Sequence, residues 1–191
     1  MPVNNIYISG NNIVSDDEIL ELSGLDSYPS FLLTSKSNIR DLIRENKYIK
    51  DVKIKKKMGN KFYVEVEEYK VIALNDVGNV ILSSGEILEN SYELYDVPKL
   101  ITPLDSEVYD YFVDKFSEID TDVLRSISEI EYSPALVDGD RFLLYMSDGN
   151  LVHVTLTKIN KINKYNGIKD VLDGRYGIIY LDSGDYVELK G

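Results

Sequence analysis

The stretch that most constrains the fold of this chain is residues 3–20, which form in succession a predicted strand, a turn and a capped helix. Ile6 and Ile8 alternate with polar neighbours, a pattern typical of a half-buried strand. Ser15 and Glu18 form an S-x-x-E capping box, in which two otherwise unpaired backbone N–H groups are satisfied reciprocally. Such a β-α start indicates a small binding module and gives no hint of an active site.

The helix predicted after this box is bounded at both ends. Val14 and Ile19 occupy the two positions of a hydrophobic staple, which fixes how the chain enters the helix. The helix runs to Leu22 and stops at Gly24, a residue suited to the left-handed conformation that ends many helices. Residues 31–33 are then expected to form a buried connector.

A second helix and a hairpin complete this first unit, from about residue 3 to 69. Ser35 or Ser37 caps the helix, which carries one apolar stripe. In the hairpin, a three-residue loop at 58–60 pairs Ile54 with Val64, because a two-residue turn would mix the faces of the strands. The last loop residue, an asparagine, can take the positive φ that this loop needs. The predicted order is strand-helix-helix-strand-strand, with two helices on one face of a small sheet.

From about residue 71 the chain is richer in strands. The proline in residues 97–101 favours an edge or a loop there. In a second hairpin with an x-Gly-Asn loop, the same parity test pairs Met146 with Val152 and Leu144 with Val154. The predicted strands are 72–74, 80–82, 127–132, 142–146, 152–156, 177–181 and 185–189, and the predicted helices are 108–116 and 158–172.

Composition narrows the possible partners. The chain has 191 residues, enough for one large domain or two small ones, and a net charge of −12. A negative surface repels phosphate backbones, so we expect no nucleic-acid partner and favour a basic or apolar protein surface. No apolar run approaches the ~20 residues that span a bilayer. Met1-Pro2 followed at once by a strand is more typical of an engineered start than of a natural one, which leaves room for a membrane anchor upstream.

The sequence offers few groups for catalysis. There is no cysteine and one histidine, His153, for which we expect a structural or solvent-facing role. A zinc site with one histidine would need three carboxylates, an improbable set. We therefore expect no enzyme activity, no cofactor and no metal.

Two segments are candidates for binding. The lysines at 55–57 suit an anionic lipid or an acidic partner, but we prefer a polar strand end paired across to glutamates. The C-terminal hairpin, residues 178–189, leaves a sheet edge that can template strand addition by another chain. Equally, it is an edge blunted by Asp182, Asp185 and Glu188.

Together these residues resemble the FtsQ/DivIB family. The first unit looks like a POTRA domain of that type, on Ile6, Ile8, Gly10-Asn11, Val14-Ser15, Glu18-Ile19, Val52, Ile54, Phe62, Val64, Val66 and Glu68. The second is similar to the β-domain of the family, on Asp76, Gly78, Pro98-Lys99-Leu100, Leu144, Asp148-Gly149, Val152 and Tyr180-Leu181-Asp182. The family's proline before the third POTRA strand is replaced here by Met58-Gly59-Asn60, so that loop is reshaped.

The resemblance implies an α+β fold: a βααββ POTRA domain at 3–70, then at 71–191 a larger β-rich domain with helices packed on an antiparallel sheet. It implies a non-enzymatic scaffold of the divisome that binds membrane-anchored proteins of the FtsL and FtsB/DivIC type and helps control septal peptidoglycan synthesis. Such a protein is single-pass in the cell membrane at the division septum, with its C-terminal region extracytoplasmic.

In that family the partner adds a strand to the last strands of the β-domain. The resemblance carries this site to Tyr180, Leu181, Asp182, Tyr186 and Val187, and a proline at Tyr186 is then expected to abolish binding while the fold survives. The alternative is a POTRA-containing, chaperone-like module of a secretion or outer-membrane assembly protein.

Overall fold

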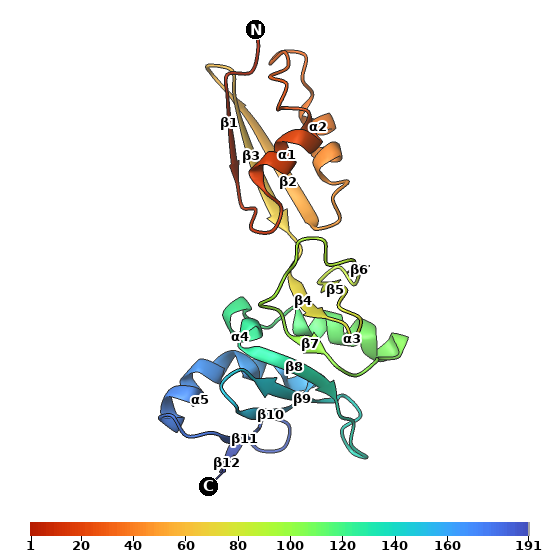
Figure 1. Ribbon diagram of the computed structural model, residues 1–191, viewed down its shortest axis with the longest axis vertical. Helices are drawn as coiled ribbons and strands as arrows, with labels where there is room; N and C mark the ends of the chain where they lie inside the picture. The colour runs from red at the N-terminus through yellow and green to blue at the C-terminus, as the bar shows by residue number, and fades with distance from the viewer. Residues whose placement is uncertain (191) are drawn as a thin grey trace. The chain divides into compact units, whose positions relative to one another are not determined.

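The structure is a computed structural model that describes residues 1–190, and its chain divides into two compact units between Tyr69 and Lys70. We call them unit 1 and unit 2. In Figure 1 unit 1 runs from red to yellow and unit 2 from yellow to blue.

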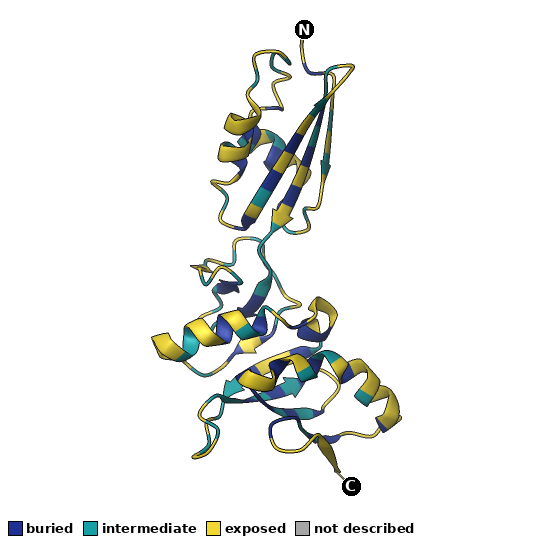
Figure 2. Cartoon of the chain, turned by 180° about the vertical axis from the view of Figure 1, so that it is seen from behind, coloured by how far each residue is buried: buried dark blue, intermediate teal, exposed yellow. Residues whose placement is uncertain are grey.

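Unit 1 is a three-stranded sheet with two helices on one face. The sheet order is β1-β3-β2; β1 runs parallel to β3, and β2 pairs antiparallel with it. Figure 2 shows buried and exposed residues alternating along β2 and β3, as expected for strands with one covered face. Its elements are β1 (Asn5–Ser9), α1 (Asp16–Ser23), α2 (Lys36–Ile43), β2 (Ile49–Lys57) and β3 (Lys61–Glu68).

The predicted N-cap and hydrophobic staple of α1 are confirmed. Ser15 Oγ accepts a hydrogen bond from Glu18 N at 3.2 Å, and the staple residues Val14 and Ile19 are both buried. At the other end, Gly24 takes a left-handed φ of 68° and caps the helix. Local sequence therefore determined this element.

Gly10 and Glu68 join β1, β3 and the turn before α1. A Cβ on Gly10 would lie 2.1 Å from the carbonyl oxygen of Val66, and its φ is +90°, so only glycine fits there. The Glu68 carboxylate accepts backbone N–H bonds from residues 12–14 at 2.9–3.0 Å. A charged acceptor thus satisfies three backbone donors that the turn leaves unpaired.

The β2–β3 hairpin has the predicted register. Ile54 faces Val64 and Asn60 takes a φ of 55°, as the three-residue loop requires. The pairing expected for the lysines at 55–57 is wrong, however. They lie opposite Tyr63, Phe62 and Lys61, because the strand's glutamates begin only at position 65.

The predicted burial of residues 31–33 is also wrong. Phe31 packs edge-on against Phe62 with ring centroids 5.4 Å apart, but Leu32 is 77% and Leu33 87% exposed. Thr34 N bonds to Ser30 O at 3.0 Å, so these residues form one tight turn. Such a turn can direct only part of its surface inward, and Phe31 occupies that position.

Unit 2 is built on one nine-stranded sheet of order β12-β11-β10-β9-β8-β7-β4-β5-β6. The sheet is mixed and not antiparallel as expected, since β4/β7, β7/β8 and β10/β11 pair in parallel. Helices cover one face, and the rings of Phe112, Phe116 and Phe142 meet at the core with centroids 4.3–5.7 Å apart. The strands are β4 (Val71–Leu74), β5 (Val80–Leu82), β6 (Ile87–Leu88), β7 (Lys99–Leu100), β8 (Ile127–Tyr132), β9 (Arg141–Met146), β10 (Leu151–Thr155), β11 (Gly177–Tyr180) and β12 (Tyr186–Leu189). The helices are α3 (Ser106–Phe116), α4 (Thr121–Arg125), the 3₁₀-helix η1 (Leu156–Lys164) and α5 (Tyr165–Leu172). The fold class is therefore the α+β class predicted.

The segment around Pro98 departs from the prediction of an edge or a loop. β7 lies inside the sheet between β4 and β8. Pro98 immediately precedes this strand, where its missing N–H costs no ladder bond, while its carbonyl accepts from Leu74 N at 2.8 Å. The strand is only two residues long, too short for a sequence pattern to reveal it.

The register predicted for the β9–β10 hairpin is wrong by two residues. Val152 faces Leu144, and Val154 faces Phe142. The loop is residues 147–149, because Met146 N bonds to Asn150 O at 2.9 Å and closes it one residue earlier than expected. A shift of two keeps each side chain on its predicted face, so the core is unaffected.

The helix predicted over 158–172 is divided into η1 and α5 at Lys164/Tyr165. The buried residues of η1 recur every three positions: Leu156, Ile159 and Ile162. That period matches the 3.0 residues per turn of a 3₁₀-helix rather than the 3.6 of an α-helix. Asn166-Gly167, a pair of residues with low helix propensity, lies inside α5.

Candidate partner-binding edge

β12 is an edge strand of the nine-stranded sheet in unit 2. All four of its residues are exposed, as the yellow strand near the C-terminus in Figure 2 shows. The opposite edge, β6, has only two residues. An exposed edge presents unpaired N–H and C=O groups to any strand that can align with it.

The hydrogen-bond pattern identifies which backbone groups of β12 are free. Lys190 N bonds to Tyr176 O at 3.1 Å, and antiparallel pairs alternate, so Glu188 and Tyr186 bond inward to β11. The position of Glu188 O agrees, because it would lie 2.2 Å from a Cβ on Gly177. The N–H and C=O groups of Val187 and Leu189 therefore point away from the sheet.

One face of this edge carries a row of stacked rings. His153 of β10 stacks on Tyr180 of β11 at 5.1 Å, and Tyr180 stacks on Tyr186 of β12 at 4.6 Å. The Tyr180 hydroxyl donates to a Glu188 carboxylate oxygen at 3.3 Å. Desolvation first, and the Glu188 charge second, raise the pKa of Tyr180.

The other face of β12 continues the apolar core face outward. Val187 lies opposite Ile179, which is buried, and Leu189 lies opposite Gly177. Val187 is 36% and Leu189 46% exposed, so apolar surface remains uncovered on this side. An added strand would bury both side chains and also pair with their free backbone groups.

Two lysines of η1 hold the turn between β11 and β12. Lys158 Nζ donates to the backbone carbonyl of Asp182, and Lys161 Nζ pairs with Asp185 at 2.6 Å. Residues three apart lie on one side of a 3₁₀-helix, which is why both reach the same turn. The sequence analysis did not predict the role of these lysines. The apolar residues at every third position in 156–164 are a signal that would have placed both lysines on one face.

Five residues were predicted to form the site, and the structure brings three of them to the edge. Tyr180, Tyr186 and Val187 lie together on β11 and β12. Leu181 and Asp182 are only 5% and 6% exposed and lie in the turn, where they support the hairpin. Leu189 was not predicted, although the alternation from Val187 places it beside the same free edge.

A buried polar network anchors β11 from beneath. Asn150 Oδ1 accepts from Gly177 N at 2.9 Å, and Asn150 Nδ2 donates to the Tyr165 hydroxyl at 2.9 Å. That hydroxyl donates to Asp148 at 2.7 Å. Burial first, and the Asp148 carboxylate second, raise the pKa of Tyr165 far above its ordinary value. The β9–β10 loop, α5 and β11 are thereby fixed to one another.

His153 lies in the ring stack as a structural residue. Its Nδ1 is buried without a hydrogen-bond partner in the described part of the chain, and burial lowers its pKa. The Asp182 charge opposes that shift and Arg141 adds to it. Within residues 1–190, no three acidic or histidine side chains converge in a way that could hold a metal ion.

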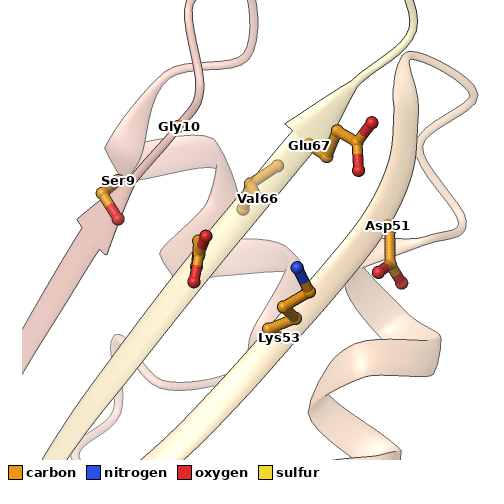
Figure 3. A pocket seen from close by; sticks show the side chains of 7 residues that line it. Ser9, Gly10, Asp51, Lys53, Val66 and Glu67 are labelled. Carbon is orange, nitrogen blue, oxygen red and sulfur yellow. The ribbon is translucent and has the colours of Figure 1, made fainter.

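Unit 1 contains a shallow hollow of about 460 Å³ on its sheet, shown in Figure 3. Its lining mixes one lysine with three carboxylates and holds no imidazole that could activate Ser9, so it suggests no reaction. The lining residues are Ser9, Gly10, Asp51, Lys53, Glu65, Val66 and Glu67.

Among residues 1–190, no helix has the length and apolar character needed to cross a bilayer.

Comparison with known proteins gives concordant matches. Residues 1–69 match the family model of the POTRA domain, FtsQ-type. The cell division protein DivIB of Bacillus subtilis (strain 168) is 32% identical over 196 residues, covering 99% of this chain and 74% of that protein. DivIB of Geobacillus kaustophilus (strain HTA426) is 27% identical over 192 residues, covering 96% and 74%. Among solved structures, the major extracytoplasmic domain of the trans isomer of DivIB from Geobacillus stearothermophilus is similar at 26% identity. That alignment has a TM-score of 0.46 and covers 56% of this chain and 96% of the solved one.

Proposed function

The chain belongs to the DivIB family of cell division proteins, and from this we propose that it is a non-enzymatic divisome scaffold that binds its partners by strand addition at β12. Its role in cell division and the predicted family resemblance are confirmed by the matches to its relatives. The secretion or outer-membrane assembly alternative has no such support and is set aside.

The observation that carries the proposal is the outward-facing backbone of Val187 and Leu189 on a fully exposed strand. Two residues with free N–H and C=O groups offer four hydrogen bonds to a partner strand. Side chains on both faces then supply selectivity, with Tyr186 on one and the apolar pair on the other. An edge that binds a partner through its backbone and selects it through its side chains suits a scaffold better than an enzyme.

The partners we propose are membrane-anchored division proteins of the FtsL and FtsB/DivIC type, through which septal peptidoglycan synthesis is controlled. We further propose that the protein is anchored in the cell membrane at the septum with this region extracytoplasmic. Residues 3–70 would then be the POTRA domain and 71–191 the β-domain. Tyr180, Tyr186 and Val187 are the proposed contact residues, joined by Leu189 and supported by Leu181 and Asp182.

The experiment that tests the edge replaces Val187 with proline. This removes one outward N–H and places a ring in the path of the added strand, while every bond from β12 to β11 is kept. The proline at Tyr186 suggested by the sequence is a poorer test, because Tyr186 belongs to an inward-bonding pair with Tyr180. Affinity for the extracytoplasmic part of the FtsB/DivIC-type partner is measured by calorimetry.

We expect Val187→Pro to weaken that affinity by about tenfold or more, the loss of at least one backbone hydrogen bond with added steric exclusion. Ile87→Pro on the opposite edge is the matched control, because Ile87 is also exposed and also lies in a pair that is not hydrogen bonded. The control should bind normally. Unchanged affinity in Val187→Pro, with circular dichroism showing an intact fold, would rule out strand addition at β12.

A further inference from the structure

We propose that one end of unit 1 binds directly to an anionic lipid surface, inserting exposed leucines among the headgroups while nearby lysines contact them. We call this end the apex and define it as Leu32, Leu33, Met58, Lys36, Lys57 and Lys61. The site is separate from β12 and does not depend on the function proposed for that edge.

Backbone hydrogen bonds bring the segments of the apex together. Phe31 N donates to Met1 O at 2.9 Å, and Asn4 N donates to Asn60 O at 2.9 Å. Lys56 Nζ donates to Phe31 O at 2.6 Å, which ties the 30–34 turn to β2. The 30–34 turn and the β2–β3 loop therefore flank the same N-terminal residues, as seen at the top of unit 1 in Figure 1.

The apolar side chains of the apex are more exposed than a folded unit needs. Leu32 is 77%, Leu33 87% and Met58 96% exposed. They are held there by packed neighbours, since Phe31 lies against Phe62 and Lys56 covers both rings at 4.9 and 5.2 Å. Apolar groups fixed in water at a loop tip are typical of binding surfaces.

The charge around these residues indicates what they bind. The protein has a net charge of −12, yet residues 27–40 and 52–64 contain no Asp or Glu. Lys36, Lys57 and Lys61 form no ion pair among residues 1–190. A cationic region with protruding leucines is complementary to an anionic bilayer. Each lysine near such a surface raises the binding constant by about fivefold. An acidic protein would satisfy the lysines but would leave the leucines in water.

The test exploits the absence of tryptophan from the chain. Leu33→Trp places the chain's single tryptophan at the apex, and Leu136→Trp places it in a unit 2 loop where Leu136 is also fully exposed. Each variant of the full chain is mixed with vesicles of phosphatidylglycerol and phosphatidylcholine, or of phosphatidylcholine alone. We expect a blue shift only for the Leu33 probe and only with phosphatidylglycerol.

Co-sedimentation with the same vesicles separates the contribution of the leucines to binding from that of the lysines. Leu32→Ser/Leu33→Ser should lower the bound fraction by about tenfold, and Lys57→Gln/Lys61→Gln by a similar factor that disappears at high salt. Leu136→Ser/Val137→Ser, an equally exposed pair, should change nothing. The proposal fails if the wild-type chain ignores anionic vesicles, if the leucine variant binds as well as wild type, or if an acidic peptide binds the apex while vesicles do not.

Discussion

Two of this protein's hairpins, β2–β3 and β9–β10, each contain a Gly-Asn pair at the turn but use it differently. In the β2–β3 loop, Gly59 and Asn60 both take positive φ, at 82° and 55°. In the β9–β10 loop only Gly149 does, at 91°, while Asn150 leaves the loop and is buried. The same Gly-Asn pair therefore gives two registers, and in the second the asparagine side chain has partners far along the chain.

Those partners explain the shift of two residues. Asn150 bonds to Gly177 of β11 and to Tyr165 of α5, elements more than ten positions away in the chain. Both bonds direct the side chain into unit 2, and Asn150 makes them from the position just after the loop. In the β9–β10 hairpin, the register that places Asn150 outside the loop is therefore the one that allows both distant bonds.

The largest effect should separate the two asparagines. Asn150→Ala leaves Gly177 N–H buried without its acceptor, so we expect the free energy of unfolding to fall by about 3 kcal/mol. Asn60→Ala loses only its tolerance of positive φ and should cost about 1 kcal/mol or less. Urea denaturation measures both, and hydrogen exchange at Gly177 reports the lost bond directly. Equal losses in the two variants would contradict this account of the register.

The two glycines, in contrast, should behave alike. Both have positive φ, and a Cβ on Gly149 meets nothing within 4 Å, while one on Gly59 would meet only the flexible end of Lys61 at 3.6 Å. The cost of Gly59→Ala and Gly149→Ala is therefore backbone strain alone, about 1–2 kcal/mol for each. Thermal unfolding measures the loss of unfolding free energy in each variant. If the two losses differ by more than about 1 kcal/mol, tertiary packing also contributes at one of these glycines.

The smallest effect is one of pH. The only histidine, His153, lies in β10, and burial lowers its pKa from the ordinary value of 6.5. Below about pH 6.5 the unfolded chain takes up a proton that the folded one resists, so unit 2 should lose stability as the pH falls, by about 1 kcal/mol or less.

His153→Gln should remove that dependence between about pH 7.5 and 5.5, where the carboxylates hardly titrate. Unit 1, which has no histidine, should hold its stability over the same range. Hydrogen exchange resolved by unit is the measurement, and an equal loss in both units would assign the effect to other groups.

Much of the candidate site followed from sequence pattern. Alternation and end position placed the edge hairpin at residues 177–189, and the structure has β11 and β12 there. Tyr180 and Tyr186 lie on one face because they form a cross-strand pair. The sequence did not predict which backbone groups of β12 point outward. That depends on which residue pairs of β11 and β12 are hydrogen bonded, and the bond from Lys190 N to Tyr176 O shows which they are. The burial of Asp182 could not be predicted from the sequence either, because Lys158 of η1 fixes its position.

Short-range information in the sequence determined the elements that are stabilised locally: the Ser15 cap of α1, the Gly24 stop and the Met58–Asn60 loop. It also determined the family, because the order of those elements is distinctive. Tertiary structure alone decided the strand of Lys99–Leu100, the register at Asn150 and the exposure of Leu32 and Leu33. The physical reason is common to all three. Each depends on a hydrogen bond or a packing contact with a residue far along the chain, and such contacts exist only once the sheet or the turn has formed.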